Sequence, residues 1–131
     1  MTLPPSSAPL VLIVDDNERN RKLAGDVLRA AGLRTIDAAS GHESLNLAAE
    51  RRPDVILLDL RLPDMDGADV ARRLRTDART AGIPVVALSA MRNAGESASL
   101  VTAGFAGFLE KPIDVRAFPE QVRSHCRRAD G

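Results

Sequence analysis

Short apolar runs alternate with amphipathic stretches along this chain, and this alternation predicts an α/β fold with a parallel sheet. Five runs are expected to form strands: residues 10–14, 34–39, 55–59, 84–89 and 106–109. The runs at 10–14, 55–58 and 85–88 are uninterrupted and rich in Val, Ile and Leu, as is typical of strands buried on both faces. Residues 34–39 alternate less cleanly, which indicates an edge or near-edge strand.

Five helices are predicted between and after these strands. The expected segments are 18–31, a helix capped at Ser40 that runs to about Arg51, one opening at Asp66 or Gly67, 94–103, and a last helix capped by Asp114. In the first, Leu23, Ala24, Val27, Leu28 and Ala31 recur at helical spacing. Gly and β-branched or hydroxyl residues weaken the fourth helix, and Pro119 predicts a late or irregular start for the fifth. One domain over residues 10–128 follows, with a lead-in at 1–9 and a tail at 129–131.

Polar side chains stand where four of these strands end. Asp15 and Asp16 follow the first run, Asp59 ends the third, Ser89 ends the fourth, and Lys111 follows the fifth. Because parallel strands place their carboxyl ends along one crevice, we expect these groups to lie together. Any one of them alone is better explained as a cap, a turn residue or a solvated charge. Their joint occurrence favours a site that binds a phosphoryl group.

Three clustered carboxylates repel one another, by roughly 3 kcal/mol for each pair at about 5 Å and an effective dielectric constant near 20. Lys111 offsets part of this charge, and a hard divalent cation with oxygen ligands, Mg²⁺, is the natural complement. Asp59 is then the expected nucleophile, since carboxylates form acyl phosphates. Asp15 and Asp16 are expected to hold the metal, and Ser89 and Lys111 to bind phosphoryl oxygens. The backbone N–H groups of Leu60 and Ala90 are expected to point at the same group.

Composition narrows the function classes. The 131 residues hold 18 basic and 18 acidic side chains, so the zero formal net charge gives no support to a nucleic-acid partner. Cys126 is the single cysteine, which excludes an internal disulfide and fits a reducing, cytoplasmic setting. The first nine residues lack the pattern of a signal peptide, and no apolar run has membrane-spanning length. His42 and His125 are expected on the surface and Cys126 in the core.

The set Asp15-Asp16, Asp59 with Pro63 and Gly67, Ser89-Ala90 and Lys111-Pro112 resembles the receiver domain of two-component response regulators, over residues 11–127. The resemblance implies a flavodoxin-like five-stranded sheet of order 2-1-3-4-5 and phosphorylation of Asp59 by a histidine kinase or phosphotransfer protein. It implies Mg²⁺ bound by Asp16, Asp59 and the Arg61 carbonyl, with Asp15 acting through metal-bound water. It also implies a cis Lys111-Pro112 peptide and a switch in which Ser89 moves and Phe108 turns inward.

A single-domain response regulator, with no enzymatic activity beyond its own phosphorylation and dephosphorylation, is the function we expect. Its downstream protein partner would bind the last two helices and the fifth strand. A receiver excised from a hybrid kinase is an alternative, since the stretch from Asp15 to Arg21, with Asn17 and Asn20, resembles receivers of that kind. A Mg²⁺-dependent haloacid-dehalogenase-type phosphatase, a flavin carrier and a degenerate scaffold fit less well. The phosphatase needs an aspartate where Asn17 stands, and the flavin carrier needs a loop that is not acidic.

Overall fold

A single parallel sheet organises the molecule. The computed structural model describes residues 8–89 and 101–126. Its strands are β1 (Leu10–Val14), β2 (Arg34–Ala38), β3 (Val55–Asp59), β4 (Val85–Ser89) and β5 (Gly107–Glu110), in the spatial order β2-β1-β3-β4-β5. Every neighbouring pair is parallel. The predicted fold and strand order are therefore confirmed, and β2 lies at the edge as expected.

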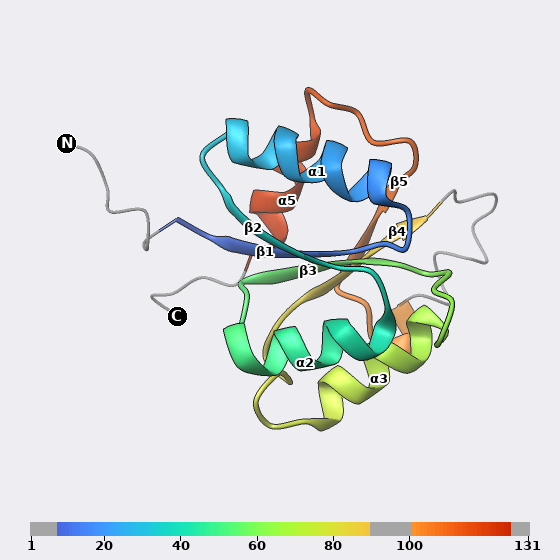
Figure 1. Cartoon of the computed structure of the whole chain (residues 1–131). Helices are drawn as coiled ribbons and strands as arrows, with labels where there is room; N and C mark the ends of the chain where they lie inside the picture. Colours follow the sequence, from blue (N-terminus) through green and yellow to red (C-terminus); the bar gives the residue numbers. More distant parts are fainter. Residues whose placement is uncertain (1–7, 90–100, 127–131) are drawn as a thin grey trace.

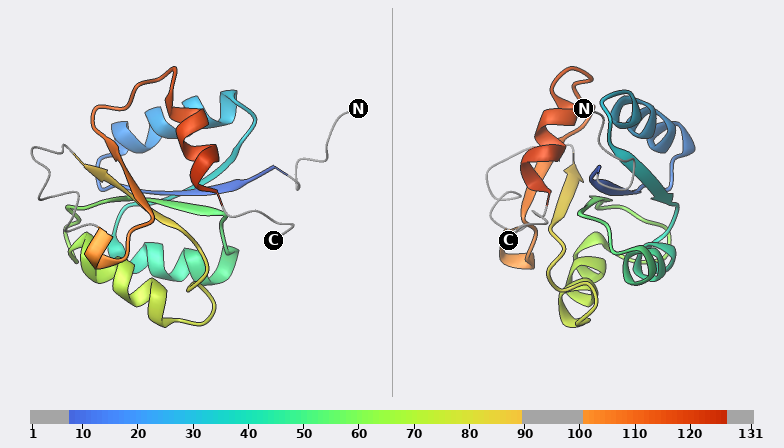
Figure 2. Two further views of the ribbon diagram at one scale, coloured as in Figure 1. Left: turned by 180° about the vertical axis from the view of Figure 1, so that it is seen from behind. Right: turned by 90° about the vertical axis from the view of Figure 1, so that its left-hand side faces the viewer.

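Helices cover both faces of this sheet. Helices α1 (Glu18–Ala30) and α5 (Phe118–His125) lie on one face, while α2 (Gly41–Arg51) and α3 (Gly67–Thr76) lie on the other (Figure 1). The two further views in Figure 2 show the same layers from behind and from the side. Residues 101–103 are helical. The rest of the helix predicted at 94–103 lies outside the described residues.

The apolar runs form two cores, one on each side of the sheet. Alternate residues of β1 separate between them: Val11 and Ile13 pack on the α1/α5 side, and Leu12 and Val14 on the α2/α3 side. Each of these four side chains is at most 1% exposed. A charged side chain inside a strand that is buried on both faces would be removed from water. The charged residues therefore lie beyond the end of the strand.

Three local predictions need correction. Leu23 is 47% exposed because the buried stripe of α1 follows Ala24 and Leu28, one helical turn apart. Asp114 caps a turn before α5, through the Arg116 N–H at 3.0 Å, and the helix itself begins at Phe118, in line with the expected effect of Pro119. His125, predicted on the surface, is partly buried, with its imidazole ring against Gly107 of β5.

The start of α2 differs in detail from a capping box. Ser40 Oγ accepts from the Glu43 N–H at 3.2 Å, as predicted, but the Glu43 carboxylate accepts from the Ala39 N–H at 2.6 Å instead of from Ser40. The helix still begins and ends where the sequence indicates.

Of the helices in residues 8–89 and 101–126, none combines the length and apolar character needed to cross a bilayer.

Candidate functional site

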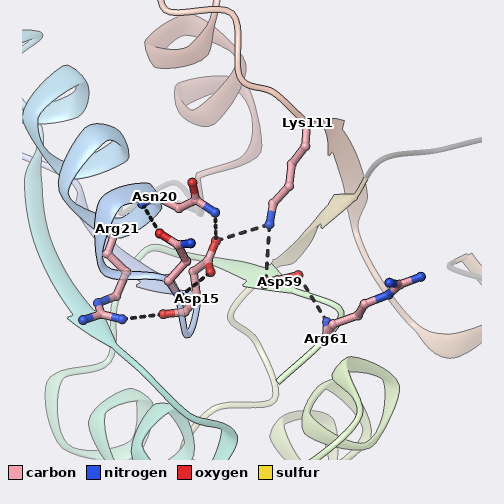
Figure 3. Close-up of polar contacts among 7 residues, drawn as sticks. Asp15, Asn20, Arg21, Asp59, Arg61 and Lys111 are labelled. Carbon is pink, nitrogen blue, oxygen red and sulfur yellow. Dashed lines mark hydrogen bonds and ion pairs between the residues drawn. The ribbon is translucent and has the colours of Figure 1, made fainter. Parts of the chain in front are cut away.

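The carboxyl ends of the strands bring Asp15, Asp59 and Lys111 together, as Figure 3 shows. Asp15 follows β1 directly, Asp59 is the last residue of β3, and Lys111 follows β5. One carboxylate oxygen from each of Asp15, Asp16 and Asp59 can be chosen so that all three lie within 4.8 Å of one another. Residues far apart in the sequence thus meet at one edge of the sheet.

Asp15 is a buried and fully engaged carboxylate. It is 1% exposed, and its oxygens accept from the Asn17 N–H at 2.9 Å, the Asn20 amide at 3.2 Å and the Lys111 ammonium at 3.2 Å. A charge removed from water needs such partners, because an unpaired buried carboxylate is strongly unfavourable. These contacts orient Asp15 and leave little of its lone-pair capacity for other ligands.

Lys111 bridges the buried Asp15 and the partly buried Asp59. Its ammonium lies 3.2 Å from Asp15 and 3.3 Å from Asp59, and its side chain is 26% exposed (Figure 3). The Lys111 N–H donates to the Ser89 carbonyl at 3.0 Å, which ties the base of the side chain to β4. The peptide between Lys111 and Pro112 is cis, as the resemblance implied. The cation is therefore held beside Asp59.

Asp59 has fewer donors than Asp15. Its carboxylate receives the Arg61 N–H at 3.2 Å and the Lys111 ion pair, and its side chain is 13% exposed. Burial raises the pKa of Asp59 above its ordinary value, and the Arg61 N–H and Lys111 only partly oppose this; the negative charge of Asp15 adds to the rise. Of these two carboxylates, Asp59 is thus the one with capacity left for a further cationic partner.

The donor set fits Mg²⁺. This ion takes oxygen ligands at about 2.1 Å, so two ligands on opposite sides of one ion lie about 4.2 Å apart. One oxygen from each of Asp15, Asp16 and Asp59 lies within 4.8 Å of the other two, which is compatible with that separation. Asp16 is exposed and Asp59 retains lone pairs, whereas Asp15 is occupied by protein donors. Asp16 and Asp59 are therefore the carboxylates suited to hold the ion directly, and Asp15 suits contact through water; the Arg61 carbonyl is a ligand that the resemblance to receiver domains implies. The Arg61 side chain extends away from the cluster (Figure 3).

The remaining predicted residues lie around this centre. Ser89 ends β4 and is partly buried, with Glu110 of β5 opposite it in the register. Phe108 is partly buried against the core on the α2/α3 side. Leu60 follows Asp59, and its carbonyl accepts from the Gly67 N–H at 3.1 Å. The predicted donor Ala90 lies outside the described residues.

Asn20 and Arg21 belong to the site, although their chemistry was not predicted. Arg21 donates from Nη1 to the Asp15 carbonyl at 2.7 Å and pairs through Nε with Asp37 at 3.0 Å (Figure 3). Asn20 shares one oxygen of Asp15 with Lys111. Both lie on the first turns of α1, directly after the acidic pair. That proximity was the available signal, but only the folded helix places them over Asp15.

Comparisons with known proteins agree with this geometry. Residues 11–123 match the family model of the response regulator receiver domain. The chain is 40% identical over 115 residues to the polar-differentiation response regulator DivK of Brucella anthropi, covering 88% of this chain and 94% of that protein.

Solved structures are similar as well. The chemotaxis response regulator CheY4 of Vibrio cholerae superimposes with a TM-score of 0.85 at 26% identity, over 90% of this chain and 98% of that one. The receiver domain of a Pseudomonas aeruginosa sensor histidine kinase, solved with a magnesium ion coordinated in its active-site cleft, superimposes with a TM-score of 0.81 at 28% identity, over 91% of this chain and 98% of that one. From its family match, its relatives and its fold, we conclude that this chain belongs to the response regulator receiver domain family.

Proposed function

We propose that this protein is a phosphoacceptor of a two-component phosphorelay and that Asp59 is the residue phosphorylated. The observation that carries the proposal is the Lys111 ammonium, 3.3 Å from Asp59 at the edge of an acidic cluster. A site with this charge pattern suits an incoming phosphoryl group once a divalent cation has offset the carboxylates. The donor would be a histidine kinase or a histidine phosphotransfer protein.

In the proposed reaction an oxygen of Asp59 attacks phosphorus as the bond from phosphorus to the histidine nitrogen of the donor breaks. The departing nitrogen keeps the electron pair of the broken bond and takes up a proton from solvent, so the products are an aspartyl phosphate on this chain and a neutral imidazole on the donor. Lys111 would bind a phosphoryl oxygen, and the backbone N–H groups of Leu60 and Ala90 would bind others. Mg²⁺, held by Asp16, Asp59 and the Arg61 carbonyl, would neutralise phosphoryl charge when bound. Asp15, fixed by Asn17 and Asn20, would keep Lys111 in place.

The output in this proposal is a protein–protein contact. Ser89 and Phe108 lie at the end of β4 and on β5, from where a change at Asp59 can reach the surface formed by β5, α5 and the helix that includes residues 101–103. The proposed setting is the cytoplasm, where the lone thiol of Cys126 would stay reduced. Catalysis would be limited to the protein's own phosphorylation and dephosphorylation, and steady multiple turnover of a phosphate ester would contradict this.

The test is phosphorylation by acetyl phosphate with and without Mg²⁺, followed by intact mass spectrometry. We expect one phosphoryl group, stable in acid and lost in base, that needs Mg²⁺ and is absent from Asp59→Asn. The matched control is Asp77→Asn, which changes a carboxylate paired with Arg79 in the turn after α3. Labelling of Asp59→Asn equal to that of the wild type would refute the assignment.

A further inference from the structure

Asp64, in the loop between β3 and α3, holds the first turn of α2. Its two carboxylate oxygens accept from the backbone N–H groups of Gly41, at 2.8 Å, and His42, at 3.0 Å. The first N–H groups of a helix have no partner inside the helix, and a carboxylate there also complements the helix dipole. The same two bonds hold the pKa of Asp64 below its ordinary value, so the carboxylate is ionised at neutral pH. The contact therefore joins two segments 23 residues apart.

The Met65 side chain packs on Gly41, next to the two hydrogen bonds of Asp64. A Cβ atom at Gly41 would lie 2.8 Å from Met65 Sδ and 3.0 Å from its Cγ. A larger residue at position 41 would force the Met65 side chain to shift. We call the bonds of Asp64 and the packing of Met65 on Gly41 the loop–helix contact.

The other side of this loop faces the acidic cluster. Arg61 and Asp66 form an antiparallel bridge, and the Gly67 N–H donates to the Leu60 carbonyl at 3.1 Å, so the loop is closed at its base. The Arg61 N–H in turn donates to Asp59 at 3.2 Å. A short closed loop moves as one unit, so anchoring its outer side to α2 restricts where the backbone of Arg61 can lie.

We propose that Asp64 is a positioning residue for the phosphorylation site: by fixing the loop on α2, it holds the Arg61 backbone against Asp59 and so sets where the Arg61 carbonyl, the implied Mg²⁺ ligand, can lie. This inference rests on the proposed function, since it assigns the loop a role in metal binding. It makes α2 part of the support of the site, although no residue of α2 belongs to the acidic cluster. Because coupling between two sites is reciprocal, Mg²⁺ binding should stabilise the loop–helix contact by the same factor.

The test compares Asp64→Ala with Ser40→Ala. Both variants remove acceptors from N–H groups in the first turn of α2, but only Asp64 also belongs to the loop. Mg²⁺ affinity is measured by isothermal titration calorimetry. Amide hydrogen exchange at Arg61 and Gly67 is followed by NMR in metal-free buffer. We expect Asp64→Ala to weaken Mg²⁺ binding roughly tenfold, at the lower end for residues that support metal ligands, and to speed exchange at both amides. Asp64→Asn, which keeps one acceptor oxygen, should give an intermediate loss.

Ser40→Ala should lower the melting temperature yet leave Mg²⁺ affinity and both loop amides unchanged. Equal Mg²⁺ affinities for Asp64→Ala and the wild type, or equal losses in Asp64→Ala and Ser40→Ala, would overturn the proposal. If the wild type itself binds no Mg²⁺, the proposed function fails. The exchange rates at Arg61 and Gly67 still report whether Asp64 orders the loop.

Discussion

The loops that follow β1 and β3 carry the same kind of charge in different surroundings. Asp15, after β1, is held by a backbone N–H, a side-chain amide and an ammonium. Asp59, at the end of β3, has one backbone N–H and a share of the same ammonium, and its pKa is raised by burial. Both groups are carboxylates, so the difference between them comes from the number of hydrogen-bond donors around each. The donors hold Asp15 in place, whereas Asp59 keeps lone pairs for a further ligand.

Lys111 is shared by both loops, so replacing it should give the largest effect. In metal-free buffer Lys111→Met leaves the buried carboxylates facing one another, and we expect a loss of about 2 kcal/mol in the free energy of unfolding, below the value for a fully buried pair. With the site charge made more negative, Mg²⁺ should restore more stability in this variant than in the wild type. Urea denaturation in EDTA and in Mg²⁺ measures both effects.

The control for this change is Lys22→Met, which removes a largely exposed lysine paired with Asp26 on α1. Its effect should be much smaller than that of Lys111→Met, since exposed ion pairs contribute little stability. Similar losses in the two lysine variants would mean that the bridge between Asp15 and Asp59 contributes no special stability.

Replacing Asp15 and Asp59 by asparagine, one at a time, should show the difference between the two loops in their stability. In EDTA we expect Asp15→Asn to be less stable than Asp59→Asn by about 1.5 kcal/mol, since the Asp15 carboxylate has three charge-assisted hydrogen bonds to lose and the Asp59 carboxylate has two. Asn at position 59 keeps an acceptor for the Arg61 N–H and relieves an unfavourable charge. Chemical denaturation of the two variants side by side provides the measurement, and equal stabilities would remove the distinction between the loops.

Asn20→Ala should have a smaller effect, confined to the β1 side. The variant removes the amide that shares an oxygen of Asp15 with Lys111, and Asn20 is exposed, so water can replace part of the bond. We expect a loss of about 0.5–1 kcal/mol. Asn46→Ala, an exposed helical asparagine on α2, should be neutral or stabilising because alanine favours helix. An equal response of the two positions would deny Asn20 a role in holding Asp15.

The smallest expected effect is a pH dependence assigned to Asp59. Its folded-state pKa lies above the ordinary 3.8, so the protonated form favours folding. The contribution of protonated Asp59 to the free energy of unfolding is fully present below the unfolded-state pKa. It is lost as pH rises through the raised folded-state pKa. In EDTA the advantage of Asp59→Asn over the wild type should therefore grow with rising pH across this window and then level off. Denaturation curves from pH 3 to pH 8 test the trend; a constant difference would contradict it.

The amino-acid pattern alone determined the fold and the composition of the site. Three apolar runs that end in Asp15, Asp59 and Ser89 require strands buried on both faces, and parallel strands end at one edge. This is why the parallel sheet, the acidic cluster and the approach of Lys111 to Asp59 were predictable, whereas the strand order was expected only from the resemblance to receiver domains. The period of the apolar residues indicates which face of an element is buried. A run of β-branched residues likewise predicts a strand from the local sequence alone.

Tertiary structure alone decided which donors each carboxylate receives. The ammonium on Asp15 comes from 96 residues away, and Asp64 finds its partners on α2, 23 and 22 residues back in the chain. Leu23 shares the helical spacing of its neighbours yet stays exposed, since the width of the buried stripe depends on what packs against it. Such contacts depend on distances between elements, and those distances exist only once the sheet and its helices have packed together.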